Sequence, residues 1–233
     1  PGPYERACQI GHYLKTHKPK SKVIILDKKD KFSKQGLFTQ AFERHYKGII
    51  EWRKAADTNG GVIRVDAKAG TVSTEFDDMK PAVANIIPAQ KAGAIAETAG
   101  LTDDSGWCPI SGQTFESTIH KDIHVVGDAA IQSPLPKSGY AANSEAKVVA
   151  AAVVELVNGR AAPTPSWVNT CYSIVAPNDG ISVAMVYNLV DGKVAKVKGS
   201  GGLTPADSSP EHRAREVQYA YSWFDNITHD IFG

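Results

Sequence analysis

The stretch that most constrains the fold runs from Ile123 to Val154, where a β-branched segment, a Gly-Asp pair and an alanine-rich segment follow one another. Ile123–Val126 has the composition of a short buried strand, and it ends at Gly127 and Asp128. After a Pro-rich connection, the residues that follow Ser138 have the composition of a long helix. A strand that leaves an acid at its carboxyl end, before a helix with a small and polar first turn, is typical of a cofactor crevice in an open α/β sheet. The sequence therefore predicts an α/β fold with a ligand site at this point.

The residue types in this stretch suit a polar ligand. Gly127 lets the backbone come close to a bound molecule, and Asp128 can accept a hydrogen bond from a hydroxyl group. The unpaired N–H groups at the start of the helix, near Ser138 to Tyr140, favour negative charge. A strand, a Gly-Asp turn and a helix also occur in ordinary α/β proteins, so a site without a cofactor stays open on these residues alone.

Composition excludes several classes of function. With 26 basic and 25 acidic residues the net charge is +1, which gives no electrostatic case for nucleic acid or an anionic membrane surface. No apolar run approaches the length that spans a bilayer. The pattern G-x-G-x-x-G is absent, so a nicotinamide cofactor is poorly supported. Cys8, Cys108 and Cys171 lie far apart without the spacing of a zinc site, and no metal is predicted.

Hydrophobic patterns along the chain predict an α/β order of elements with an α+β C-terminal part. The expected helices cover residues 1–17, a segment through Phe38, Phe42 and Tyr46, residues 91–99, a segment after Ser138, and a terminal segment from Pro210. The expected strands are 21–27, a hairpin of 62–66 and 71–76, 83–87, 123–126, 169–175, 181–187 and 193–198. Composition places a linker at 161–165. The predicted domains are 1–82, 83–160 and 161–233.

The chain also resembles a known family. H-V-V-G-D-A followed by P-K-S-G-Y-A-A-N resembles the last flavin-contacting segment of two-dinucleotide-domain flavoproteins, and P-K-S-G-Y narrows the likeness to sulfide-oxidising members. P-G-P-Y-E-R-A, S-K-V-I-I-L-D, N-T-C-Y-S-I-V-A-P and R-E-V-Q-Y-A-Y-S-W-F-D-N-I-T-H-D resemble the flavoprotein subunit of flavocytochrome c sulfide dehydrogenase. These motifs agree in order and cover essentially the whole chain.

The resemblance implies an incomplete two-dinucleotide-binding-domain flavoprotein fold with a small C-terminal interface domain. Residues 1–82 would be an incomplete NAD-like domain, 83–160 the closing part of the FAD domain, and 161–233 the interface domain. A helix that opens at the first residue, with no strand before it, predicts that the chain lacks an upstream part of this fold. We therefore expect this chain alone to hold FAD weakly and not to turn over.

FAD is the cofactor that the resemblance implies. Asp128 would hold its ribityl chain, and the helix after Ser138 would point its N-terminus at the pyrimidine edge of the flavin. Trp223 would shield the flavin or line a path to the haem of the partner, although composition alone favours plain core packing. The expected cofactor-binding residues are Gly127, Asp128, Ala129, Lys137, Ser138, Gly139, Tyr140 and Trp223.

The chemistry that the resemblance implies is sulfide oxidation at a redox-active cysteine pair beside FAD, with the electrons passing to a c-type cytochrome subunit. The cysteine of N-T-C-Y-S is Cys171, and its partner is expected just upstream of residue 1. Cys8 and Cys108 have the surroundings of structural thiols. Glu5 is a candidate general acid or base toward sulfide or a cysteine, with a helix-dipole role as the alternative. The family further implies a periplasmic location.

Two other functions remain open at this point. One is a sulfide:quinone oxidoreductase-like flavoprotein, which needs an apolar quinone channel and a membrane-attached end. The other is a non-catalytic interaction module that keeps the fold without FAD.

Overall fold

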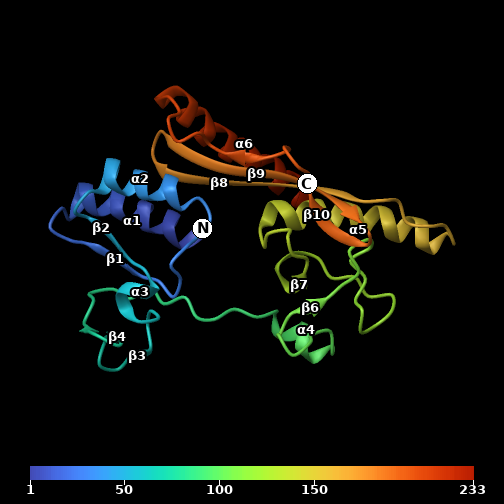
Figure 1. The fold of residues 1–233 in the computed structure, drawn as a ribbon, viewed down its shortest axis with the longest axis horizontal. Coiled ribbons are helices and arrows are strands. Elements are labelled where there is room, and N and C mark those ends of the chain that lie inside the picture. Colours follow the sequence, from blue (N-terminus) through green and yellow to red (C-terminus); the bar gives the residue numbers. More distant parts are fainter. The chain divides into compact units, whose positions relative to one another are not determined.

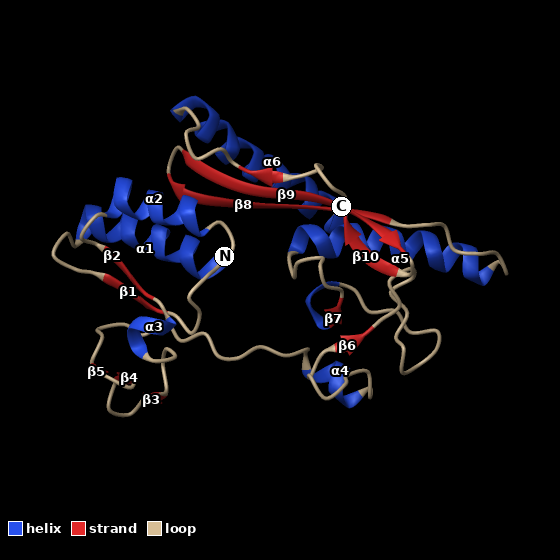
Figure 2. Ribbon diagram, in the orientation of Figure 1, coloured by secondary structure: helices blue, strands red, loops and turns tan.

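The computed structural model describes all 233 residues and divides the chain into two compact units. Unit 1 consists of Pro1–Pro88, Tyr172–Ser182 and Thr204–Ser222, and unit 2 of Ala89–Cys171, Val183–Leu203 and Trp223–Gly233. Figure 1 follows the chain in colour, and Figure 2 shows its helices and strands. Helices and sheets are mixed in both units, which confirms the α/β fold class. The three domains predicted from the sequence remain a prediction.

The N-terminal part of unit 1 is a parallel strand pair connected through a helix. Its elements are α1 (Gly2–His17), β1 (Val23–Leu26), α2 (Gln35–Tyr46), β2 (Ile50–Arg53), α3 (Ala55–Thr58), β3 (Arg64–Asp66), β4 (Thr71–Ser73) and β5 (Asp78–Met79). β1 and β2 are parallel, with Val23 opposite Ile50 and Leu26 opposite Arg53, and α2 provides the crossover that parallel neighbours require. β3, β4 and β5 form a small antiparallel sheet.

The core of unit 1 is aromatic. α1 and α2 bring their buried faces together with residues of the later strands, and the buried cluster comprises Tyr4, Cys8, Leu37, Phe38, Ala41, Phe42, Tyr46, Val175 and Ile181. Phe38 is fully buried, and burying a side chain of this size stabilises a fold by about 1.5–3 kcal/mol. The Tyr46 hydroxyl donates to the carbonyl of Val175 at 2.6 Å, which ties the end of α2 to the later strand.

Unit 2 is built around one long helix. Its first elements are α4 (Ala94–Thr98), β6 (Cys108–Pro109), the 3₁₀ turn η1 (Gly127–Ala129), β7 (Ala130–Ile131) and α5 (Gly139–Val157). β6 and β7 pair in parallel over two residues. One buried cluster contains Ala92, Ala96, Leu101 and Cys108, and another contains Phe115, Leu135, Trp167 and Tyr187.

The remaining elements contribute residues to both units. They are β8 (Ser166–Ala176), β9 (Asp179–Val190), β10 (Lys193–Lys196), β11 (Gly202–Leu203) and α6 (Pro210–Phe232). β10 and β11 are both antiparallel to β9, which also pairs with β8. Trp167, Asn169, Ser173 and Val175 on β8 are buried, as expected for alternate positions on one face of a strand, and Cys171 on the same face is half-buried.

Most of the longer predicted elements are confirmed. These are the helices now seen as α1, α2, α5 and α6, the strand β1, the hairpin of β3 and β4, and the strands β8, β9 and β10. The predicted helix 91–99 is shorter, at Ala94–Thr98, and is followed by Gly100 in the left-handed region at a φ of 68°. β2 was not predicted, because the only element expected between Lys28 and Lys54 is the helix through Phe38, Phe42 and Tyr46.

Two predicted strands are wrong. Residues 83–87 form no strand, and Val83 is 85% exposed, because no other strand pairs with this apolar run. Residues 123–126 form only one isolated bridge, between His124 and Glu116, and Ile123 and Val126 remain exposed. β-branched composition alone does not make a ladder where the chain supplies no neighbouring strand.

Candidate functional site

The Gly-Asp turn forms the first part of the predicted site, in unit 2. Gly127 has a φ of 74°, and an added Cβ would lie 3.3 Å from the Cβ of Ala142, so both backbone conformation and space favour glycine. Its N–H donates to Oε2 of Glu145 at 2.6 Å. Asp128 is exposed, and its carboxylate is therefore accessible to a ligand. Ala129 completes the 3₁₀ turn.

Glu145 is a buried carboxyl group that the sequence analysis did not single out. Its side chain is fully buried on α5, and Oε1 has no hydrogen-bond partner. Burial raises the pKa of Glu145, and the hydrogen bond from Gly127 opposes this shift. Gln132, directly after β7, is also buried, and neither polar atom of its amide has a partner. Buried polar groups are normally paired, so unit 2 has polar groups left over for a ligand.

Lys137 lies in the connection before α5, and its side chain contacts the Gly-Asp turn. Its Nζ donates to the carbonyl of Ala130 at 2.9 Å and to the carbonyl of Asp128, and it lies 3.8 Å from the centroid of the Trp107 ring. Burial lowers the pKa of Lys137, while the carboxylate of Asp128 acts in the opposite direction. The ammonium group is therefore held on the Gly-Asp turn by backbone carbonyls, and the residue itself is exposed.

Ser138 joins the start of α5 to the strand that carries Cys171. Its hydroxyl caps the helix by accepting from the N–H of Ala141 at 3.1 Å, and it donates to Oδ1 of Asn169 at 2.5 Å. Asn169 is buried on β8, two positions before Cys171. Residues i and i+2 of a strand share a face and are about 7 Å apart along it. Cys171 therefore lies on the same strand face as the residue that holds the N-terminus of α5.

Tyr140 and Trp223, two predicted cofactor residues far apart in sequence, are neighbours in unit 2. Their rings stack at 5.8 Å between centroids and 13° between planes. Lys147 and Asp230 add an ion pair of 2.5 Å between α5 and the last turns of α6. The structure thus places a large aromatic surface beside the first turn of α5, where Gly139 is exposed.

The three cysteines differ in their surroundings. Cys8 is fully buried, and burial, with smaller contributions from Glu5 and Asp179, raises the pKa of its thiol to about 12. Burial also raises the pKa of the Cys108 thiol. Cys171 is half-buried, and no two of the three cysteines form a disulfide. Of the three thiols, that of Cys171 is therefore the most accessible, and reaction with sulfide requires access to the sulfur.

Glu5 belongs to unit 1, where its carboxylate is held by the backbone. Oε1 accepts from the N–H of Ile174 at 2.7 Å. It also lies in the first turn of α1, as the helix-dipole alternative requires. Its catalytic role stays a prediction.

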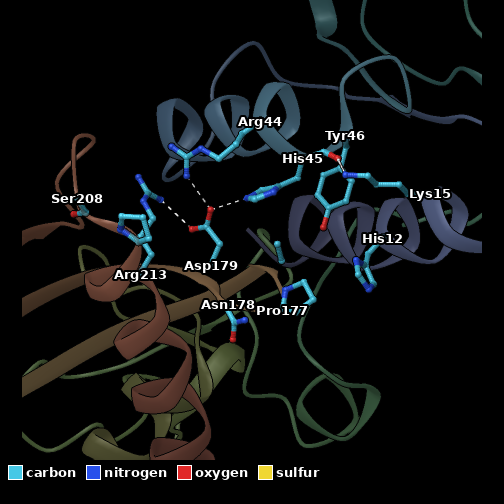
Figure 3. A pocket seen from close by; sticks show the side chains of 12 residues that line it. His12, Lys15, Arg44, His45, Tyr46, Pro177, Asn178, Asp179, Ser208 and Arg213 are labelled. Atoms are coloured by element: carbon cyan, nitrogen blue, oxygen red, sulfur yellow. Dashed lines mark hydrogen bonds and ion pairs between the residues drawn. The ribbon is translucent and has the colours of Figure 1, made fainter.

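Unit 1 contains a cavity of about 650 Å³ that was not expected from the sequence. Figure 3 shows Arg44, His45 and Arg213 directed at Asp179, with Lys15 and His12 on α1. No motif marks this cavity, because its residues come from four separate stretches of the chain.

No group of three or more His, Cys, Asp or Glu side chains is arranged to hold a metal ion. No helix is long and apolar enough to cross a membrane.

The residues of unit 2 fit the isoalloxazine end of a flavin. The unpartnered Oε1 of Glu145 and amide of Gln132 are buried polar atoms of the kind that a polar ligand can satisfy. The N-terminus of the 19-residue helix α5 and the fixed ammonium of Lys137 favour negative charge. The donor set therefore suits a ring system that becomes negatively charged on reduction.

Comparison with known families supports the same assignment. Residues 1–88 match the model of the sulfide dehydrogenase [flavocytochrome c] flavoprotein chain, central region. Residues 163–232 match the model of the flavocytochrome c sulphide dehydrogenase flavin-binding region. The chain belongs to this flavoprotein family. Glu5, Cys171 and Trp223 lie in the matched parts, whereas Gly127 to Tyr140 lie between them.

The chain is also similar in fold to a solved structure. The matched structure is a chain of the cryo-EM structure of the Tetrahymena thermophila mitochondrial ATP synthase F1Fo composite tetramer, with a TM-score of 0.55 and 19% identity. The match covers 77% of this chain and 45% of that chain. At this identity the likeness concerns the fold alone. Both family matches name the sulfide dehydrogenase, and neither names the quinone-linked alternative.

Proposed function

We propose that this protein oxidises sulfide at the sulfur of Cys171 and passes the electrons through FAD to a c-type cytochrome subunit. Sulfide opens a disulfide between Cys171 and a second cysteine, which leaves a persulfide on one sulfur and a thiolate on the other. When the thiolate sulfur then bonds to the persulfide sulfur, one proton and two electrons are released, and the flavin would be their acceptor. FAD, when bound, supplies a two-electron acceptor that can release the electrons one at a time.

The observation that carries the proposal is the hydrogen bond between Ser138 and Asn169. It joins the helix end expected to meet the flavin to the strand face that bears Cys171, at 2.5 Å between the two side chains. A sulfur that donates electrons to a flavin must lie against it, and this bond supports such a placement. Asn169, which the sequence analysis did not single out, acts as a positioning residue.

The other residues have distinct roles in the proposal. Asp128 accepts from the ribityl hydroxyls, and the Gly127 turn admits the cofactor to close range. Lys137 and the N-terminus of α5 stabilise the negative charge that accumulates on the pyrimidine edge. Tyr140 and Trp223 exclude water from the ring system by their stacked surface.

The second cysteine is expected outside the 233 residues. Cys8 and Cys108 do not suit the role, because burial raises the pKa of both thiols and disfavours the thiolates that disulfide exchange requires. Glu5 serves as the proton donor or acceptor for sulfide. We further propose a periplasmic location, in keeping with a c-type cytochrome partner.

The test is sulfide-dependent reduction of the cytochrome by the flavoprotein that contains this chain, in complex with its cytochrome subunit. We expect Cys171→Ser to abolish the reaction, because serine can form neither the disulfide nor the persulfide. Cys108→Ser is the matched control, since it makes the same atomic change at a buried thiol, and it should keep most of the activity. Unchanged turnover in Cys171→Ser would refute the assigned role.

A further inference from the structure

The cavity around Asp179 in unit 1 carries an inference that is independent of sulfide oxidation. Its walls come from α1, the end of α2, the turn between β8 and β9, and the start of α6. At about 650 Å³ it falls within the range of cavities that hold small ligands. It contains neither Cys171 nor any predicted flavin residue.

The charge of the cavity is positive. Three permanent cations, Lys15, Arg44 and Arg213, face one carboxylate, Asp179, which leaves a net charge of +2 when the two lining histidines are neutral. A hollow lined by one sign of charge concentrates ions of the other sign. A ligand for this cavity is therefore an anion.

Asp179 holds the basic side chains in place but accepts hydrogen bonds from only some of their N–H groups. Its Oδ2 accepts from Arg44 at 2.9 Å and from His45 at 2.7 Å, and its Oδ1 lies 3.3 Å from Nη1 of Arg213. Arg44 spends one nitrogen on this contact and remains 45% exposed at the side chain. Each guanidinium has five N–H donors in a planar fork, so donors remain for a second anion.

The side chain of Arg213 gives the strongest evidence that the cavity takes up a ligand that accepts hydrogen bonds. Its side chain is only 3% exposed, Nη1 contacts Asp179, and Nη2 donates to the carbonyl of Ala206 at 3.2 Å. Its Nε is buried without any hydrogen-bond partner. A purely structural ion cluster accounts for Asp179 and the paired nitrogens, but not for a buried guanidinium N–H that lacks an acceptor.

The N-terminus of α6 adds to the positive electrostatic potential of the cavity. Ser208 and Pro210 line the cavity, and Pro210 is the first residue of α6, which runs for 23 residues. The N-terminus of a helix of this length carries a partial positive charge, although Pro210 has no N–H and the N–H groups of His212 and Arg213 donate to Ser209. Helix N-termini together with arginine are a common arrangement for binding oxyanions.

We propose that this cavity binds a tetrahedral oxyanion of the sulfate or phosphate type between Arg44, Arg213 and Lys15. The oxyanion is either an inorganic ion or the charged group of a small organic phosphate, whose apolar part would lie against Tyr46 and Pro177. Asp179 holds the two guanidinium groups in place, and the ligand accepts from the nitrogens that Asp179 leaves unused.

Isothermal titration calorimetry of the folded chain tests the proposal, with sodium sulfate, inorganic phosphate and phenyl phosphate as probes at constant ionic strength maintained with sodium chloride. We expect saturable binding at one site per chain for at least one probe. Tighter binding of phenyl phosphate than of both inorganic ions would identify an organic ligand, and equal or weaker binding would identify the inorganic ion. Heats equal to those of sodium chloride for all three probes would overturn the proposal.

Variants locate the binding. We expect Lys15→Gln, which removes an exposed cation outside the Asp179 cluster, to weaken binding severalfold, and Arg44→Gln to weaken it at least tenfold. Lys47→Gln is the matched control, because it removes one positive charge beside the end of α2 without lining the cavity, and it should leave the affinity unchanged. If Lys47→Gln weakens binding as much as Lys15→Gln and Arg44→Gln, the ion binds by general attraction and the site is refuted. Circular dichroism of each variant separates loss of binding from loss of fold.

Discussion

Two buried carboxyl groups, Asp179 in unit 1 and Glu145 in unit 2, are treated very differently by their surroundings. Both oxygens of Asp179 are paired, Oδ2 with Arg44 and with the ring of His45, and Oδ1 with Arg213. Glu145 accepts one backbone N–H through Oε2, its Oε1 has no partner, and burial raises its pKa. Asp179 stabilises the fold through its ion pairs. Burial disfavours the charged form of Glu145, which lies beside the turn that is predicted to bind a cofactor.

The difference shows how one kind of side chain serves two purposes. A buried ion pair is costly to form, but removing one partner is more costly, because it leaves the other charge buried and unpaired. A buried carboxyl group without a cation avoids this cost by taking up a proton. We therefore expect opposite responses when the charge of each residue is removed.

The largest expected effect is at Asp179. Asp179→Ala should lower the free energy of unfolding by about 3–5 kcal/mol, because the guanidinium of Arg213 loses its only carboxylate. Chemical denaturation measures this change. The matched control is Asp77→Ala, which breaks a distant, largely exposed contact with Arg53 and should change stability little. Equal stabilities for the two variants would show that the cluster at Asp179 contributes nothing to the fold.

A smaller effect of opposite sign is expected at Glu145. Because its pKa is raised in the folded state, the folded protein binds this proton more tightly than the unfolded chain does. The stabilisation from the neutral carboxyl group is complete below the unfolded pKa, about 4.3, and is lost as the pH rises through the higher folded value. Glu145→Gln stays neutral, so at pH 7 it should match or exceed the wild type in stability.

Unfolding measured from pH 5 to pH 8 checks this prediction. The wild type should lose stability with rising pH more steeply than Glu145→Gln, with a difference below about 1 kcal/mol. Glu155→Gln is the control on the same helix, since Glu155 pairs with Arg160 at the surface. If Glu145→Gln and the wild type have the same pH dependence, the carboxyl group is not the neutral buried group described here.

The sequence predicted those parts of the fold that depend on local patterns. α5 could be predicted from Ser138 as its cap and from the alanine-rich segment behind it, and α1 from its prolines and spacing. The strands at 83–87 and 123–126 failed because strand formation depends on a neighbour that composition cannot reveal. Whether Val83 is buried or exposed is likewise decided by tertiary structure, so the composition of residues 83–87 could not predict it.

The candidate site was predictable only through its motifs. Gly127, Ser138 and Cys171 occur in recognisable segments, and the contact between Tyr140 and Trp223 could not be inferred from their separation of more than 80 positions. Asn169 could have been noticed from the motif N-T-C, since alternate residues share a strand face. The Asp179 cavity could not, because its residues share no motif and meet only in the folded unit.

Flavin reduction by sulfide under anaerobic conditions tests the central claim, that Cys171 delivers electrons to a flavin held at the N-terminus of α5, most directly. Sulfide is mixed with the FAD-loaded flavoprotein in the absence of cytochrome, and the loss of the oxidised flavin absorbance is recorded for the wild type, Cys171→Ser and Cys108→Ser. We predict rapid bleaching in the wild type and in Cys108→Ser, and none in Cys171→Ser. Bleaching of Cys171→Ser at the wild-type rate would contradict the account.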